Sequence, residues 1–109
     1  SVERLDDLAD EARRTLERLG YDNVRIRVGD GTRGWPEEAP FDGIVITAAA
    51  PDVPPSLQRQ LSEDGGRLVA PVGSRTMQDL VRMVREGEEF RSEVLMGCRF
   101  VPLLGEEGW

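Results

Sequence analysis

The sequence has 109 residues, a length that accommodates one domain and excludes a two-domain enzyme. Hydrophobic residues make up 39% of it, which is typical of a globular chain and too many for a fully disordered one. Acidic residues outnumber basic ones by 21 to 14, for a net charge of −7, so the chain lacks the basic character of a nucleic-acid-binding protein. All 14 cations are arginine and histidine is absent, which excludes a Schiff-base lysine, a P-loop lysine and any nucleophile activated by histidine within this chain.

Cysteine usage and hydrophobic patterning favour a cytoplasmic protein. Cys98 is the only cysteine, which excludes an intrachain disulfide and a thiolate zinc site and suits a reducing compartment. No apolar run approaches the roughly 20 residues of a membrane span, and the first residues lack the basic and apolar regions of a signal peptide. No group of acidic residues has the spacing of a metal site. We therefore expect no nucleic-acid partner, no membrane partner and no bound metal.

The first predicted elements are a helix and a strand. Apolar residues recur at helical spacing from Leu5 to Leu19, which predicts a helix with one stripe facing a core. Acidic residues in its first turn and Gly20 after its end mark the two helix termini. Residues 24–28 then alternate apolar and charged side chains, which predicts a strand.

Further strands alternate with one short helix. Residues 29–40 hold three Gly and two Pro and predict a loop. Residues 43–47 form an apolar run typical of a parallel strand buried on both faces, so Val45→Asp is expected to collapse the fold. A helix near residues 56–61, a turn at 64–66 and a buried strand at 67–72 follow.

The last part of the sequence predicts antiparallel structure. Residues 80–85 and 90–95 flank Gly87 as the two arms of a hairpin, and residues 99–104 either continue the second arm or form a separate edge strand. Strand–helix alternation followed by a hairpin predicts an open, doubly wound α/β sheet with an antiparallel edge.

Candidate binding residues follow the ends of the predicted strands, where ligands bind in open α/β sheets. Glu3, at the end of a short extended stretch before the first helix, is an acceptor suited to ribose hydroxyls, or only a negative charge near a helix start. Gly29-Asp30-Gly31 lets the backbone approach a ligand beside a carboxylate, or forms a tight turn. Trp35 walls an apolar pocket or packs the loop.

The small residues after the predicted strand 43–47 allow two interpretations. Residues 47–50 read Thr-Ala-Ala-Ala, which leaves space for a ligand beside the Thr47 hydroxyl. The same small side chains suit close contact between a helix and a sheet. The residues alone do not decide between these interpretations.

Taken in order, several blocks resemble the protein-L-isoaspartate O-methyltransferase family over nearly the whole chain. They include Ser1-Val2-Glu3-Arg4, the stretch 14–24, Gly29-Asp30-Gly31-Thr32 through Pro36, and residues 41–51, 65–73 and 99–103. That family consists of class I S-adenosylmethionine-dependent methyltransferases, which methylate the free carboxylate of isoaspartyl residues in damaged proteins and so start their repair. Isoaspartyl proteins and peptides are therefore the expected partners.

The resemblance implies a role for nine residues. Glu3 would bind the cofactor ribose, and Asp30 with the Gly31 backbone would bind the adenine edge. Thr47, the candidate catalytic residue, and Ala48 would lie by the reacting methyl group of the S-adenosylmethionine cofactor. The residues implied for the peptide substrate are Ala49, Ala50, Arg99 and Val101.

The resemblance also implies a Rossmann-like α/β class I methyltransferase sheet, amino-terminally truncated, with an antiparallel hairpin at the carboxy-terminal edge. Residues 1–109 would form a partial domain that lacks the first strand and the glycine-rich cofactor loop. Since that strand lies between the second and the fourth, we expect two separated sheet pieces with exposed edges and impaired methyl transfer. The alternatives are a complementing half that binds a missing amino-terminal segment, a noncatalytic module that pairs or self-associates through strand edges, and a class I methyltransferase with another acceptor.

Overall fold

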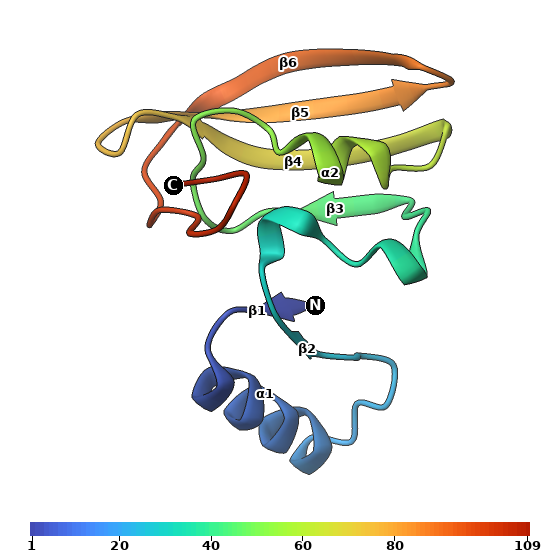
Figure 1. The fold of residues 1–109 in the computed structure, drawn as a ribbon, viewed down its shortest axis with the longest axis vertical. Coiled ribbons are helices and arrows are strands. Elements are labelled where there is room, and N and C mark those ends of the chain that lie inside the picture. The colour runs from blue at the N-terminus through green and yellow to red at the C-terminus, as the bar shows by residue number, and fades with distance from the viewer.

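The strands form two separate sheets in the computed structural model, which describes residues 1–109 (Figure 1). In the first sheet, β1 (Val2–Glu3) pairs in parallel with β2 (Arg27–Val28). The second has the order β3-β4-β5-β6, in which β3 (Gly43–Val45) pairs in parallel with β4 (Asp64–Gly73), and β5 (Gln78–Glu86) and β6 (Glu89–Cys98) follow antiparallel. No ladder joins β1 to β3, which confirms the expected division of the sheet.

Helix α1 (Asp6–Arg18) packs mainly against β1 and β2. Acidic residues occupy its first turn, and Gly20 follows it with a φ of 82°, as the sequence predicts. The predicted core-facing stripe, however, is largely uncovered: Ala9 is buried, while Leu19 is 60% exposed. Two strands of two residues each are too small to cover the apolar face of a thirteen-residue helix. No helix of the fold has the length and apolar character required to cross a membrane.

The strands around the gap differ from the prediction. The strand expected at residues 24–28 is reduced to β2, because its only partner, β1, offers two residues for pairing. The run 43–47 forms β3 but is not buried on both faces, since Val45 is 74% exposed. The burial on which the expected effect of Val45→Asp depends is therefore absent from this chain.

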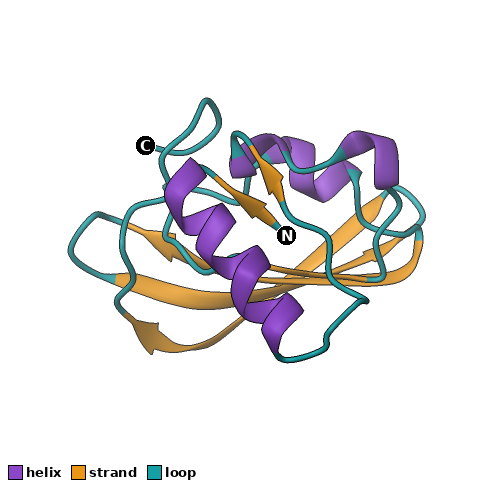
Figure 2. Cartoon of the chain, turned by 90° about the horizontal axis from the view of Figure 1, so that it is seen from below, coloured by secondary structure: helices purple, strands orange, loops and turns teal.

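The core lies between α2 (Pro55–Arg59) and the four-stranded sheet. Figure 2 shows α2 on one face of that sheet. Pro55 occupies the first turn of the helix, where its missing N–H is harmless, as the sequence predicts. Leu61 and Leu68 are fully buried at the centre of this core, whose members are Ile46, Val53, Leu57, Leu61, Leu68, Ala70 and Met83.

The hairpin β5–β6 is confirmed, with Gly87 in the turn at a φ of 62°. The turn expected at residues 64–66 is instead the start of β4, where the pairing with β5 is irregular between Asp64 and Arg67. Residues 99–104 form no strand of either expected kind. They run back beside the loop after β3 through one isolated parallel bridge between Ala49 and Pro102.

Candidate functional site

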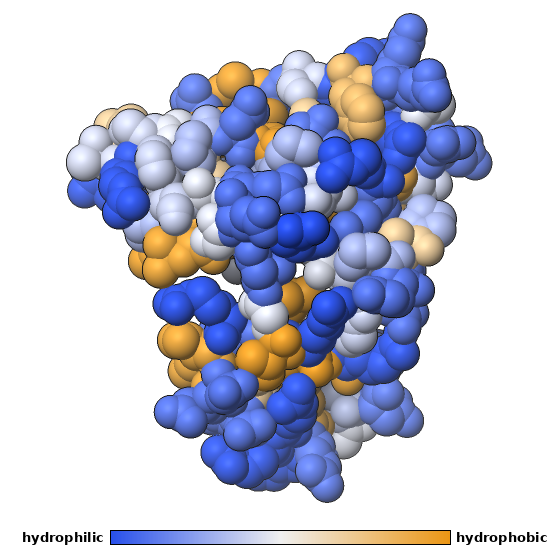
Figure 3. All heavy atoms as spheres, viewed as in Figure 1, coloured by the Kyte–Doolittle hydropathy of each residue, from blue (hydrophilic) through white to orange (hydrophobic).

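A cavity of about 510 Å³ lies between the two sheets. One wall comes from β1 and the loop after β2, and the other from β3 and the loop that follows it. Figure 3 shows the corresponding hollow between the α1 half of the molecule and the four-stranded sheet, with apolar residues gathered around it. Five of the nine predicted site residues line the cavity: Glu3, Gly31, Thr47, Ala48 and Val101.

Glu3 is the last residue of β1 and is half-buried at the cavity wall. Its backbone carbonyl accepts from the Gly29 N–H at 3.0 Å, which holds β1 against the end of β2. One carboxylate oxygen, Oε1, accepts from the Leu5 N–H at 3.3 Å, and no arginine pairs with the carboxylate. Glu3 therefore keeps acceptor positions free for donors in the cavity.

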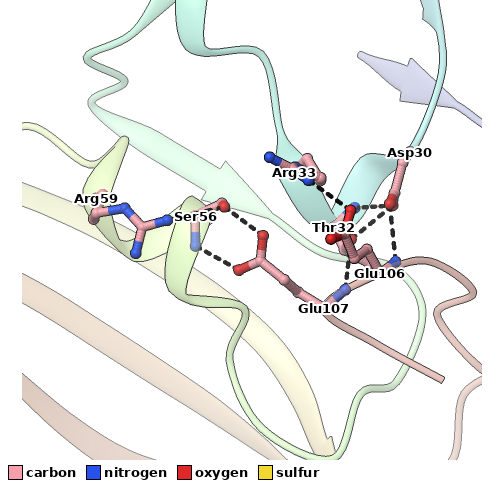
Figure 4. A network of polar contacts seen from close by, with 7 residues as sticks. All are labelled: Asp30, Thr32, Arg33, Ser56, Arg59, Glu106 and Glu107. Carbon is pink, nitrogen blue, oxygen red and sulfur yellow. Dashed lines mark hydrogen bonds and ion pairs between the residues drawn. The ribbon is translucent and has the colours of Figure 1, made fainter.

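Asp30 lies beside the cavity rather than on its wall. It lines a neighbouring hollow of about 290 Å³, which shares Val2 and Gly34 with the larger cavity. Its Oδ1 accepts from the Thr32 N–H at 2.9 Å and the Thr32 hydroxyl at 2.7 Å, and its Oδ2 accepts from the Glu106 N–H at 2.9 Å (Figure 4). Burial disfavours the charge, but these hydrogen bonds outweigh it and hold the pKa of Asp30 below its ordinary value.

The loop after β3 divides into two parts. Thr47 is exposed and Ala48 half-buried on the cavity wall, where small side chains leave room for a ligand. Ala49 and Ala50 are buried away from the cavity. The Ala49 N–H donates to the Val101 carbonyl at 2.7 Å, so this part fixes the position of the segment that follows β6.

The two residues expected on that segment are placed differently. Val101 is exposed and lines the cavity. Arg99 is also exposed, but its Nε donates to the Thr76 carbonyl at 3.1 Å and it does not reach the cavity. The cavity thus gathers five predicted residues and leaves out Asp30, Ala49, Ala50 and Arg99.

The sequence allowed two roles for Trp35, as a wall of an apolar pocket or in the packing of its loop. In the structure it lines the cavity and also packs its loop. The guanidinium carbons of Arg25 and Arg27 lie 5.5 and 5.6 Å from the centre of its ring. The backbone N–H of Trp35 donates at 2.9 Å to Oε1 of Gln60, whose Nε2 donates at 2.8 Å to the Arg33 carbonyl. Buried Gln60 therefore holds this loop in place, and nothing in its sequence context indicated that role.

The segment 105–109 is a second feature that the sequence did not reveal. The Glu106 N–H donates to Asp30, as described above. The Glu107 N–H donates to the Thr32 hydroxyl at 3.1 Å, and the Glu107 carboxylate accepts from the N–H and hydroxyl of Ser56 (Figure 4). Burial disfavours the charge of Glu107, but the bonds from Ser56 outweigh it and keep its pKa below the ordinary value. Two glycines around a Glu-Glu pair were the only signal, and they resemble any surface turn.

The cavity suits a small molecule that combines hydroxyl donors with an apolar ring. Its volume lies within the range of roughly 300–1,000 Å³ found for small-molecule sites. The free acceptor positions of Glu3 and the hydroxyl of Thr47 lie among apolar walls that include Trp35 and Phe41. These residue types fit a nucleoside.

Sequence comparisons agree with this chemistry. The family model "Protein-L-isoaspartate(D-aspartate) O-methyltransferase" matches residues 1–108. A protein-L-isoaspartate O-methyltransferase from Syntrophus aciditrophicus is 58% identical over 112 residues, which are 100% of this chain and 51% of the relative. A protein-L-isoaspartate O-methyltransferase 2 from Pelobacter propionicus is 60% identical over 111 residues, 100% of this chain and 49% of the relative. The chain thus spans about half the length of the curated relatives it matches.

Solved structures of similar proteins share the fold. One, a protein-L-isoaspartate O-methyltransferase, superposes with a TM-score of 0.88 at 33% identity and covers 99% of this chain and 34% of its own. Another, a Plasmodium falciparum protein assigned to the same activity and bound to S-adenosyl-L-homocysteine, has a TM-score of 0.77 at 26% identity and covers 94% of this chain and 50% of its own. The two-sheet α/β architecture is therefore part of a Rossmann-like methyltransferase fold, and the chain belongs to the protein-L-isoaspartate O-methyltransferase family.

Proposed function

We propose that residues 1–109 form the nucleoside-binding side of a methyltransferase that modifies the free carboxylate of L-isoaspartyl residues in damaged proteins, with S-adenosylmethionine as the methyl donor. The observation that carries the proposal is the convergence of Glu3, Gly31, Thr47 and Ala48 on one cavity, from three separate parts of the sequence. The relatives whose names state this activity match the whole chain at 58–60% identity.

The residues of this chain act mainly by positioning. When bound, S-adenosylmethionine supplies a methyl group on a sulfonium, which a carboxylate that is ionised at neutral pH attacks without a general base. The chain accordingly needs no histidine or lysine. Glu3 accepts hydrogen bonds from ribose hydroxyls, Asp30 and the Gly31 backbone contact the adenine edge, and the Thr47 hydroxyl orients the acceptor group.

The acceptor side of the site includes the segment after β6. We assign Val101, which lines the cavity, to contact with the isoaspartyl peptide. Ala49 supports it through the hydrogen bond from its N–H to the Val101 carbonyl, and Ala50 holds the same loop to β4 through its bridge with Val72. Arg99, exposed beyond the cavity, would contact a peptide away from the reacting group.

We infer that one further parallel strand completes the sheet between β1 and β3. Both strands have a free edge on the cavity, and their arrows point the same way in Figure 1. The relatives are about twice as long as this chain, so a strand of this kind has a source outside residues 1–109. The glycine-rich cofactor loop of the family is expected on that same missing part.

Val45→Asp tests for the strand, because Val45 lies on the open face of β3. In the isolated chain we expect the substitution to cost less than about 1 kcal/mol, as is usual for exposed sites. In a full-length chimera, in which residues 1–109 replace the matched region of the Syntrophus aciditrophicus relative, an unpaired buried charge should cost several-fold more. Val94→Asp, at an exposed position of β6, is the matched control and should cost little in both proteins. Equal costs of Val45→Asp in the two proteins would contradict the inserted strand.

Methyl transfer tests the activity itself. Labelled S-adenosylmethionine is offered with paired isoaspartyl and aspartyl peptides to the chimera, to the isolated chain, and to that chain mixed with the unmatched part of the relative. We expect the chimera to methylate only the isoaspartyl peptide, the isolated chain to be nearly inactive, and the mixture to recover activity. A folded but inactive chimera would refute the proposal. If the isolated chain then also forms concentration-dependent assemblies, its free strand edges favour the noncatalytic pairing module.

A further inference from the structure

The segment 105–107 holds the Asp30 carboxylate in one orientation. Three donors fix the group, two from Thr32 in its own loop and one from the Glu106 N–H, which comes from the other end of the sequence. A carboxylate has about four acceptor positions, so roughly one position on Oδ2 stays open. The direction in which that position points depends on where Glu106 lies.

The segment itself is anchored by contacts that do not involve Asp30. The Glu107 carboxylate accepts from Ser56 at the start of α2, and the Glu106 carboxylate pairs with Arg33 at 2.5 Å (Figure 4). The Trp109 ring lies under Arg75, whose guanidinium carbon is 4.8 Å from the ring centre. The Glu106 N–H is therefore fixed relative to the core side of the molecule.

Gly105 is required for this close approach rather than for its backbone conformation. It is not among the glycines with positive φ, so its dihedral angles suit other residues. A Cβ at this position, however, would overlap Oδ1 of Asp30 and press on the Thr32 methyl group. Gly97 offers a matched comparison, since its φ is also ordinary and a Cβ there meets nothing within 4 Å.

We propose that residues 105–107 are positioning residues that aim the Asp30 carboxylate at the 6-amino group of a bound adenine and so set the purine specificity of the site. The proposal rests on the proposed function, in which Asp30 meets the adenine edge. A carboxylate only accepts hydrogen bonds, so it selects a purine whose C6 carries an N–H donor over one with hydrogen or a carbonyl oxygen there. The pKa of Asp30 lies below its ordinary value, so the group is ionised and hence an acceptor at neutral pH.

The test measures binding, by titration calorimetry, of two ligands to the full-length chimera. The ligands are S-adenosylhomocysteine and its analogue with unsubstituted purine in place of adenine. A hydrogen bond to a charged acceptor predicts at least 10-fold tighter binding of the adenine ligand. Gly105→Ala should reduce this preference below about 3-fold by weakening only the adenine ligand, and Glu107→Gln should reduce it partially. Gly97→Ala should leave it unchanged.

The outcomes separate the proposal from the function on which it rests. Amide NMR spectra check that the Gly105→Ala and Glu107→Gln variants are folded. If these variants bind both ligands more weakly by the same factor, or if they keep the full preference for adenine, the segment has only a structural role and the proposal fails. Asp30→Asn is the reference for the function. If it too leaves the preference unchanged, or if the unmutated chimera binds neither ligand, the assignment of Asp30 to adenine fails and the proposal falls with it.

Discussion

Gln60 is expected to stabilise the cavity wall through two side-chain hydrogen bonds. Gln60 is 7% exposed. Its Oε1 accepts from the Trp35 backbone N–H at 2.9 Å, and its Nε2 donates to the Arg33 carbonyl at 2.8 Å. Gln60→Leu removes both hydrogen-bonding atoms of the side chain while roughly conserving its volume. A buried group left without its partner costs about 1–3 kcal/mol. Because Trp35 is only half-buried and Arg33 is exposed, water reaches part of this site, and we expect a total cost of about 2–3 kcal/mol.

Urea unfolding followed by circular dichroism measures this cost. Gln58→Leu is the matched control: Gln58 lies two residues earlier, is half-buried and makes a single side-chain bond, from Nε2 to the Val53 carbonyl at 3.0 Å. We expect the control to cost about 1 kcal/mol. A cost below about 0.5 kcal/mol for Gln60→Leu, or a larger cost for Gln58→Leu, would refute the reasoning. Gln60→Glu should destabilise at neutral pH and partly recover in mild acid, since the protonated carboxyl again donates to the Arg33 carbonyl.

Three further predictions concern the core, the pH response and one arginine. Leu68→Ala, at a fully buried position flanked by strands on both sides, should cost about 3–4 kcal/mol in urea unfolding, whereas Leu19→Ala at a mostly exposed position should cost less than 1 kcal/mol. Asp30 and Glu107 have pKa values that are lowered in the folded state, so their contribution to the free energy of unfolding is complete above about pH 5 and is lost as the pH falls through the folded-state pKa values. The urea midpoint of the double variant Asp30→Asn/Glu107→Gln should therefore fall less between pH 6 and pH 3 than that of the unmutated chain. Arg85→Lys should lower the melting temperature by several degrees, because lysine cannot reproduce the fork of bonds to the Arg59, Leu61 and Gly87 carbonyls.

Elements with local signals were predictable from the sequence. The acidic first turn and Gly20 mark the ends of α1, and Gly87 marks the hairpin, because capping and turn geometry depend on neighbouring residues. The length of β2 and the burial of Val45 were not predictable in the same way. Both depend on which strands and helices lie alongside, and in residues 1–109 no strand pairs with the outer edge of β1 or of β3.

The candidate site was predictable where it follows the strand-end rule. Glu3, Gly31 and Thr47 each lie at or just after a parallel strand, and this placed them on one cavity despite their distance in sequence. The role of the 105–107 segment could not be predicted, because its main contacts to the Asp30 loop come from backbone N–H groups, which every residue except proline carries. Gln60 was unpredictable for a related reason, since an amide side chain at the end of a short helix is equally common on an ordinary surface.

Four of the exposed large apolar side chains line the cavity between the two sheets. These four, Leu5, Val45, Val101 and Leu104, come from three segments, and each is at least 40% exposed. Covering them removes apolar surface from water, so completion of the sheet is favourable at about 25 cal/mol for each square ångström buried. Glu3 ends β1 and Gly31 follows β2, whereas Thr47 follows β3 of the other sheet, and no strand pairing joins the two sheets. Nucleoside binding and completion of the sheet should therefore reinforce one another, because each limits the relative positions of the same two walls. The isolated chain is accordingly expected to bind S-adenosylhomocysteine much more weakly than the full-length chimera, even though both proteins contain the same Glu3, Gly31 and Thr47.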